Sequence, residues 1–280
     1  YPAKDAIFYS ADVHGNQITG ERLRCISRII NHSSTGEGVL TVVTTMDGIA
    51  DRLIPVERFK EAVITLDYSS EIEPEKLAKK LVAMGFVRTG MVEDKGQFAI
   101  RGGIIDIFSY TDEAPVRIEL WDTEVDSIRM FDVESQRSIE RLQSYSIFPA
   151  TEYIFTEDEL KNGLYNIKKE CDRQLECFDY GKRKRTKEQI EAGNNLNKLV
   201  ADVERTGNYE KFTDTLVADT VGLAEYFPEE NTLVVLDEPN RLKECNELTL
   251  YEYNESMKNR LAAGYVLPSQ TNKVKAMNEI

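Results

Sequence analysis

The stretch between residues 96 and 132 constrains the fold more than any other part of the sequence, because short apolar runs and turn residues alternate along it. The turns are marked by Gly102-Gly103, by Thr111-Asp112-Glu113 and by Asp122-Thr123. Between them we predict strands over residues 97–101, 104–108, 116–121 and 127–132. The sequence therefore predicts a β-meander in this stretch.

The third of these strands separates an apolar face from a charged one. Because successive strand residues point to opposite faces, Arg117, Glu119 and Trp121 lie together, away from the apolar side chains. If the strand of Arg101 pairs nearby, two arginines and the only tryptophan share a sheet face, which is the composition of an interface hot spot. In the alternative, Trp121 is partly buried and the arginines pair internally with Glu119, Asp106 or Asp122.

A strand and a helix precede the meander. Residues 63–66 read as a strand, and residues 71–84 read as a helix with Pro74 in its first turn and Gly85 at its end. We therefore expect a separate, smaller α+β unit that begins near residue 62.

The segments on either side of this unit indicate a second kind of domain. Apolar runs predict buried strands at residues 6–9, 39–44 and 232–236. The expected helices are residues 21–31, residues 46–53, residues 157–205 with a break near 179–185, and a last stretch up to residue 263. Uninterrupted apolar strands between helices are typical of a parallel α/β sheet.

Composition limits the classes of function. With 280 residues, 41% of them hydrophobic, the chain can form a sizeable core and two or three domains. Its 49 acidic and 35 basic residues give a net charge of -14, which repels phosphate backbones, so nucleic acid is not the expected partner. The one concentrated basic run, Lys182-Arg183-Lys184-Arg185 with Lys187, is either a solvated helix start or a phosphate-contacting patch.

The cysteines and the hydropathy indicate a cytoplasmic protein. No pair of cysteines has C-x-x-C spacing, and all four read as free thiols: Cys25, Cys171, Cys177 and Cys245. No apolar run approaches the ~18 residues needed to span a bilayer, so we expect no membrane partner. The chain starts at Tyr1 rather than at methionine, and we expect it to be a piece of a longer protein.

One feature suggests an enzyme, since the apolar run at residues 232–236 ends in Asp237 and Glu238. Such a pair can hold Mg²⁺ for nucleotide hydrolysis, but acids that begin a solvent loop give the same pattern. Hydrolysis also needs a phosphate cradle, G-x-x-x-x-G-K-[ST], and the sequence has none. His14 and His32 lie in turn-rich stretches without a second histidine at metal-binding spacing. We therefore expect no catalytic, cofactor or metal site in this chain.

The meander resembles the UvrB-interaction segment shared by UvrB and the transcription-repair coupling factors (Mfd). Residues 96–108 fit the pattern Gly-x-Phe/Tyr-x-x-Arg-Gly-x-x-x-Asp-Ile/Leu-Phe, and residues 115–132 continue it with Pro-x-Arg, an acidic turn and Ser-Ile-Arg-Met-Phe-Asp. In this family the small domain is inserted into a helicase-like α/β domain. The resemblance implies a degenerate RecA-type parallel-sheet domain over residues 1–62 and 149–268, an inserted α+β UvrA-binding domain over residues 63–148, and a linker over residues 269–280.

The resemblance also implies a function. The inserted domain of the family binds UvrA and recruits excision repair to a stalled RNA polymerase, through positions that correspond to Arg101, Arg117 and Trp121. The family more often has Phe at the last position. The full-length family protein is an ATP-dependent DNA translocase, and the resemblance places its ATP, Mg, polymerase and DNA contacts in other domains of the same protein.

UvrB itself differs in two ways. It carries a tyrosine-rich hairpin for damaged DNA, where this chain has only residues 9–17, and it keeps a working nucleotide site. The alternative function is therefore a UvrB-type, ATP-dependent, DNA-acting helicase module with Asp237 and Glu238 at a nucleotide-metal site.

Overall fold

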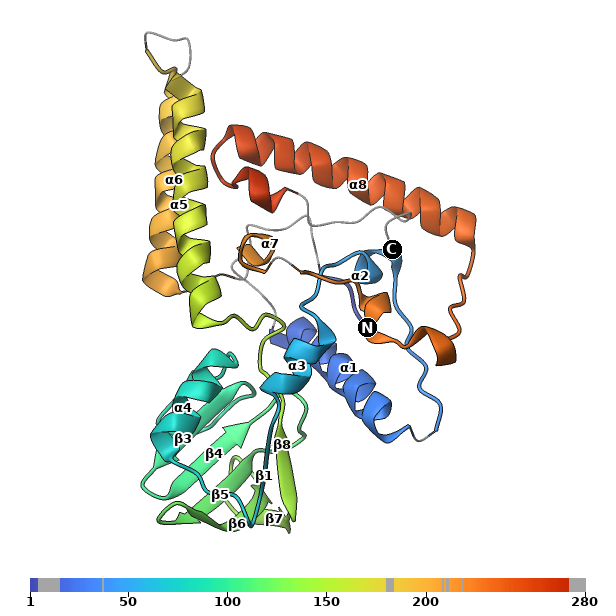
Figure 1. The fold of residues 1–280 in the computed structure, drawn as a ribbon, viewed down its shortest axis with the longest axis vertical. Coiled ribbons are helices and arrows are strands. Elements are labelled where there is room, and N and C mark those ends of the chain that lie inside the picture. The colour runs from blue at the N-terminus through green and yellow to red at the C-terminus, as the bar shows by residue number, and fades with distance from the viewer. Residues whose placement is uncertain are drawn as a thin grey trace. The chain divides into compact units, whose positions relative to one another are not determined.

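The computed structural model describes residues 1–4, 16–36, 38–179, 184–207, 209, 212–217 and 219–271. The chain is a mixed α/β protein whose described residues divide into two compact units (Figure 1). Of these residues, the first unit takes 1–2, 16–36, 38–43 and 55–154, and the second takes 3–4, 44–54, 155–179, 184–207, 209, 212–217 and 219–271.

The first unit contains a six-stranded sheet. Its strands lie in the order β2-β3-β4-β5-β6-β7, and each is antiparallel to the next except for the parallel pair β2 and β3. β1 and β8 form a separate antiparallel pair. The strands are β1 (Ile64–Asp67), β2 (Val87–Arg88), β3 (Gln97–Arg101), β4 (Ile104–Phe108), β5 (Val116–Trp121), β6 (Glu124–Phe131), β7 (Ser138–Arg141) and β8 (Ser144–Ile147). The helices of this unit are α1 (Asn16–Thr35), α3 (Val56–Ala62) and α4 (Pro74–Ala83).

Local sequence explains the centre of this sheet. The predicted meander is confirmed, since β3, β4 and β5 have the bounds predicted from the sequence and β6 begins at Glu124 rather than at residue 127. Gly102 has a φ of 61°, in the left-handed region that tight hairpin turns require and that glycine adopts without strain. The two-residue turn therefore pairs Arg101 directly with Ile104.

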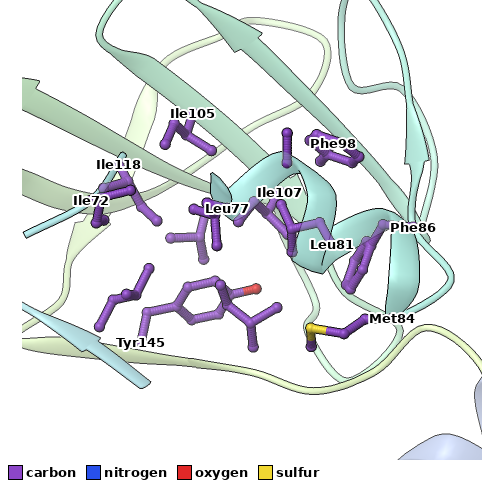
Figure 2. Packing of buried hydrophobic residues seen from close by; sticks show 14 of the residues in the cluster. Ile72, Leu77, Leu81, Met84, Phe86, Phe98, Ile105, Ile107, Ile118 and Tyr145 are labelled. Atoms are coloured by element: carbon purple, nitrogen blue, oxygen red, sulfur yellow. The ribbon is translucent and has the colours of Figure 1, made fainter. Parts of the chain in front are cut away.

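Helix α4 packs against one face of the sheet and closes the core of the first unit (Figure 2). Pro74 stands in its first turn, where no backbone donor is needed. Leu77 and Leu81 lie one turn apart on its inner face and are buried with Phe98 and Ile105 of the sheet. Fully burying such a side chain stabilises the fold by about 2–3 kcal/mol. The inner face of α4 therefore holds the helix against the sheet.

The second unit is mainly helical among its described residues. Its helices are α2 (Met46–Ile49), α5 (Glu157–Asp179), α6 (Lys187–Thr206), α7 (Thr213–Leu216) and α8 (Pro239–Ala262), with short 3₁₀ turns η2 (Leu223–Tyr226), η3 (Glu229–Asn231) and η4 (Pro268–Gln270). α5 and α6 run side by side (Figure 1). A capping box at Thr186 begins α6, and Gly207, with a φ of 64°, ends it. The predicted helical stretch with a break is therefore confirmed.

Two segments that we expected to be strands, residues 39–44 and 232–236, are not strands. Most of their apolar side chains are exposed, with Val39 exposed by 95% and Leu233 by 87%, whereas Leu40 and Val42 are partly buried. A strand needs a neighbouring segment to complete its backbone hydrogen bonds, and neither segment joins a sheet formed by the described residues. The strand prediction is therefore wrong at both places. The other expected strand, residues 6–9, lies outside the described residues.

Candidate protein-interaction face

The six-stranded sheet has a face opposite its apolar core on which charged residues gather. The strand register aligns one residue from each of five neighbouring strands, namely Ala99, Asp106, Arg117, Arg129 and Arg141. A second row beside it contains Arg101, Ile104, Glu119 and Ser127. Directly opposed residues share a face of a sheet, so both rows lie on one surface, which we call the polar face.

Asp106 is the centre of the polar face and is only 1% exposed. Arg101 donates a hydrogen bond from Nη2 to Oδ2 of Asp106 at 2.5 Å. Arg117 donates from Nε to Oδ1 at 2.6 Å and from Nη2 to Oδ2 at 2.9 Å. A buried carboxylate without partners is strongly destabilising, and here both oxygens accept from guanidinium groups. One carboxylate on β4 therefore holds two arginines from two other strands.

Arg117 is held from several directions. Its Nη2 also donates to Oε1 of Gln136 at 2.8 Å, and its guanidinium carbon lies 4.3 Å from the centre of the Phe131 ring. Gln136 has a φ of 58° and donates from Nε2 to the carbonyl of Val133 at 2.8 Å. The hydrogen bond to Asp106 raises the pKa of Arg117 above its ordinary value. With these contacts, the Arg117 side chain is 13% exposed.

Arg101 and Trp121 are the accessible members of the candidate set. The Arg101 side chain is 42% exposed despite its bond to Asp106, and Trp121 is 79% exposed at the end of β5. The register of β5 against β6 shifts between Glu119 and Leu120, just before the tryptophan. Glu119 accepts hydrogen bonds from Arg129 and from Ser127. The exposed indole therefore lies on the same strand as Glu119, which forms a second ion pair with Arg129.

These contacts decide between the alternatives left open by the sequence. The strands of Arg101 and Arg117 are not direct neighbours, because β4 lies between them and contributes Asp106. The arginines pair internally, as one alternative proposed, and Asp106 is the acid that holds both. Trp121, in contrast, is exposed rather than partly buried.

Sequence reasoning missed Gln136 as a partner of Arg117. No local pattern marks this residue, because it reaches Arg117 only when the turn between β6 and β7 folds back towards β5. Asp106 did carry a signal, since it is the one charged residue in an otherwise apolar strand. A charge at such a position indicates a buried ion pair.

The candidate nucleotide-metal residues lie in a different environment. Asp237 and Glu238 are exposed, and they follow residues 232–236, which form no strand. Glu238 accepts a hydrogen bond from Arg241 at 3.0 Å. Across the described part of the chain, no group of three or more His, Cys, Asp or Glu side chains is arranged to hold a metal ion. His32 contacts the carbonyl of Gly38 at 3.2 Å, and His14 lies outside the described residues.

The four cysteines are free thiols. Of the basic run, Lys184 and Arg185 are described and residues 182–183 are not; Arg185 donates to the carbonyl of Leu175 at 3.5 Å. In the described residues, no helix is both long and apolar enough to cross a bilayer.

A cavity of about 430 Å³ lies elsewhere in the first unit, between α1 and the loop joining β4 to β5. Arg24, Arg28, Asp112 and Glu113 line it, so it carries charges of both signs. Tyr145 donates from its hydroxyl to Asp112 at 2.5 Å. Burial raises the pKa of the Asp112 carboxyl and raises the pKa of Tyr145 well above its ordinary value. A lining with charges of both signs favours no single class of ligand.

Part of the chain matches a known domain, and nearly all of it is similar to part of a set of longer proteins. Residues 64–153 match the model of the UvrB interaction domain. The transcription-repair-coupling factor of Bacillus subtilis (strain 168) is 36% identical over 276 residues, which cover 95% of this chain and 22% of that protein. Proteins of the same name from Staphylococcus epidermidis (strain ATCC 12228) and Staphylococcus aureus (strain NCTC 8325) are 32% and 31% identical over 264 residues, covering 94% of this chain. The chain spans 22% of the length of these curated relatives.

Proposed function

We propose that the polar face of this chain is the docking site for UvrA in transcription-coupled excision repair. The premise is that the chain carries a UvrB interaction domain and is homologous over nearly its whole length to transcription-repair-coupling factors. Arg101, Arg117 and Trp121 are the partner-binding residues in this proposal. A helicase-like RecA-type arrangement around the inserted domain belongs to the same proposal.

The proposal extends to the whole protein. It would be a cytoplasmic, ATP-dependent DNA translocase that displaces stalled RNA polymerase, with its ATP and Mg sites and its polymerase and DNA contacts in other domains. This chain would then supply the recruitment step and no catalysis of its own. Support comes from the homology and from the polar face, which has the features of a docking surface rather than those of a nucleotide site.

The exposure of Trp121 is the observation that carries the proposal. An indole is the largest apolar side chain, and this one is 79% exposed at the end of a central strand. Burying such a side chain against a partner removes on the order of 150–250 Å² of surface from water. Trp and Arg are the residue types most enriched where interface binding energy concentrates. Trp121 together with the accessible Arg101 therefore provides an anchor and a charged contact on one sheet.

Isothermal titration of UvrA into the 280-residue chain tests the proposal. Trp121→Ala and Arg101→Ala should each weaken binding by about 2 kcal/mol, because both truncate accessible hot-spot residues. Tyr165→Ala and Arg88→Ala are matched controls: Tyr165 is an exposed aromatic on α5, and Arg88 is a partly exposed arginine that pairs with Glu75. Both controls should leave the affinity unchanged.

The tryptophan also allows a direct readout. Because Trp121 is the only tryptophan, incorporation of 5-fluorotryptophan labels this position alone. Binding of UvrA should shift and broaden its ¹⁹F resonance. Unchanged affinity in both Trp121→Ala and Arg101→Ala, with an unshifted resonance, would reject the UvrA assignment.

The alternative of a UvrB-type nucleotide module predicts a different result. A site built on Asp237 and Glu238 would bind Mg-ATP with micromolar affinity. We expect the 280-residue chain to bind none, because its sequence contains no phosphate-cradling motif. Equilibrium dialysis with labelled ATP separates the two functions, and saturable binding that Asp237→Asn abolishes would favour the module.

A further inference from the structure

The two arginines of the polar face depend on one residue that is almost inaccessible to a partner. Asp106 is 1% exposed, yet it accepts three hydrogen bonds, from Arg101 and from both Nε and Nη2 of Arg117. Its neighbours in the register are Ala99 on one side and Arg117 on the other. It therefore influences the polar face only through the side chains that it holds.

We propose that Asp106 is a positioning residue of the docking face, which sets the place and orientation of Arg101 and Arg117 before UvrA arrives. This inference rests on the proposed UvrA-binding function. It assigns the preorganisation of both arginines to one buried carboxylate, and it assigns a supporting share to Gln136.

The geometry supports positioning rather than simple neutralisation. The strands of Arg101 and Arg117 are two sheet spacings apart, roughly 10 Å, and free arginine side chains at that distance would sample many rotamers. Asp106 draws both guanidinium groups to the same oxygen, Oδ2, at 2.5 and 2.9 Å. Their mutual position is thus defined in the unbound chain.

The contacts of Arg117 with its partners also restrict its orientation. Its bidentate contact uses both oxygens of Asp106, which fixes the plane of the guanidinium. Gln136 also accepts a hydrogen bond from Nη2, and the Phe131 ring lies against the guanidinium. Gln136 adopts its left-handed backbone conformation, φ 58°, in the turn that brings its amide to this place. A non-glycine residue held in that conformation is often found at functional sites.

Positioning has a measurable consequence for affinity. An arginine that is already ordered loses less side-chain entropy when it binds, whereas a mobile one must be ordered by the partner. Asp106→Asn keeps the size of the side chain and one carbonyl acceptor but removes the charge-assisted, bidentate contact. We expect it to weaken UvrA binding roughly tenfold, although the changed atoms are buried.

A mutant cycle in UvrA titrations distinguishes the positioning of the two arginines from a general effect of Asp106→Asn on the chain. On the Arg101→Ala background, Asp106→Asn has only Arg117 left to disorder, so its effect on the dissociation constant should shrink. On the Trp121→Ala background, its effect should keep its full size, because Asp106 makes no hydrogen bond to the indole in the described contacts. Equal effects on both backgrounds, or no effect of Asp106→Asn on the parent chain, would overturn the inference.

NMR supplies a readout that does not depend on UvrA. The Nε–Hε group of Arg117 should be ordered in the parent chain, and its proton should be protected from exchange. In Asp106→Asn the same group should become mobile. Glu152→Gln is the matched control, since it removes the charge from another buried acid, which binds Nε of Arg22 at 2.8 Å in the same unit. The control should lower stability and leave both the Arg117 resonance and the UvrA affinity unchanged.

Gln136→Gly provides a milder second variant should Asp106→Asn fail to fold. Glycine tolerates a φ of 58°, so this change removes the Gln136 side chain, with its hydrogen bonds to Arg117 and to the Val133 carbonyl, without straining the backbone. We expect an affinity loss of about threefold, and an unchanged affinity would count against the inference. If instead Arg101→Ala and Trp121→Ala both bind UvrA normally, the proposed function fails. Loss of binding in those two with none in Asp106→Asn and Gln136→Gly would reject only the positioning role.

Discussion

The strands at the centre of the six-stranded sheet and the apolar segment at residues 232–236 have similarly β-like sequences, but only the former are strands. β3 and β4 are separated by two glycines, and β4 and β5 by a short loop, so each finds its partner close by along the chain. Closing such short loops loses little chain entropy. Residues 232–236 have no adjacent hairpin partner, and a β-like composition alone does not order them into a sheet.

Side-chain burial differs in the same way. Ile105 and Phe98 are fully buried against α4, whereas Val235 is 77% exposed. Strand propensity describes how well a side chain fits a half-buried, pleated surface, and it has little effect where no such surface exists. Local partners and a covering helix, rather than apolar content, therefore decide which of these segments become strands.

The largest effect is expected from truncating a side chain in the core of the first unit. Phe98→Ala should lower the free energy of unfolding by about 3–5 kcal/mol, because it leaves a cavity under α4. Val235→Ala, at an exposed position, should change it by no more than about 0.5 kcal/mol. Urea unfolding followed by far-UV circular dichroism measures both variants, because Trp121 is too exposed for its emission to report on the core. A loss in Val235→Ala as large as that in Phe98→Ala would show that the segment at residues 232–236 stabilises the fold as much as the buried strand does.

A smaller effect is expected at the hairpin turn. Gly102→Ala places a side chain at a φ of 61° and should cost about 1–2 kcal/mol, because the left-handed region is strained for L-residues. Gly90→Ala is the control, since an added Cβ there meets open space at an ordinary φ. Thermal unfolding of both variants measures the difference. Equal melting temperatures would show that the local turn does not set the pairing of β3 with β4.

The smallest effect concerns the loop that joins β4 to β5. Burial raises the pKa of Asp112, which accepts a hydrogen bond from Tyr145 of β8. The folded chain therefore holds this proton more tightly than the unfolded chain. The resulting stabilisation is fully present below the unfolded pKa of Asp112 and is lost as pH rises through its raised folded value.

Asp112→Asn mimics the protonated carboxyl and should remove this part of the pH dependence. Compared with the parent chain, its free energy of unfolding should fall less as pH rises through that window. Urea unfolding at a series of pH values measures the slope, and Glu113→Gln, at the exposed neighbouring position, is the control. Parallel pH profiles for the parent and Asp112→Asn would mean that burial of this carboxyl does not couple to folding.

Much of the fold was predictable because its determinants are local. Gly102-Gly103 marks a hairpin, Pro74 marks the start of α4, and Gly207 marks the end of α6; each acts within a few residues of its position. The pattern from Gly96 to Phe108 likewise identified the family without any contact information. Residues 39–44 and 232–236 were not predicted correctly, because strand formation there depends on partners distant in the sequence.

From sequence alone we could predict the strands of the meander, a helical stretch with a break where α5 and α6 lie, and the alternation that puts Arg117 and Trp121 on one face of a strand. Only the tertiary structure decided that β4 lies between the two arginines, that Asp106 holds both, and that Gln136 reaches Arg117 from a turn. The physical reason is that cross-strand contacts depend on strand order and register. Both are set by the packing of the whole sheet, whereas alternation along a single strand reveals only which side chains share a face.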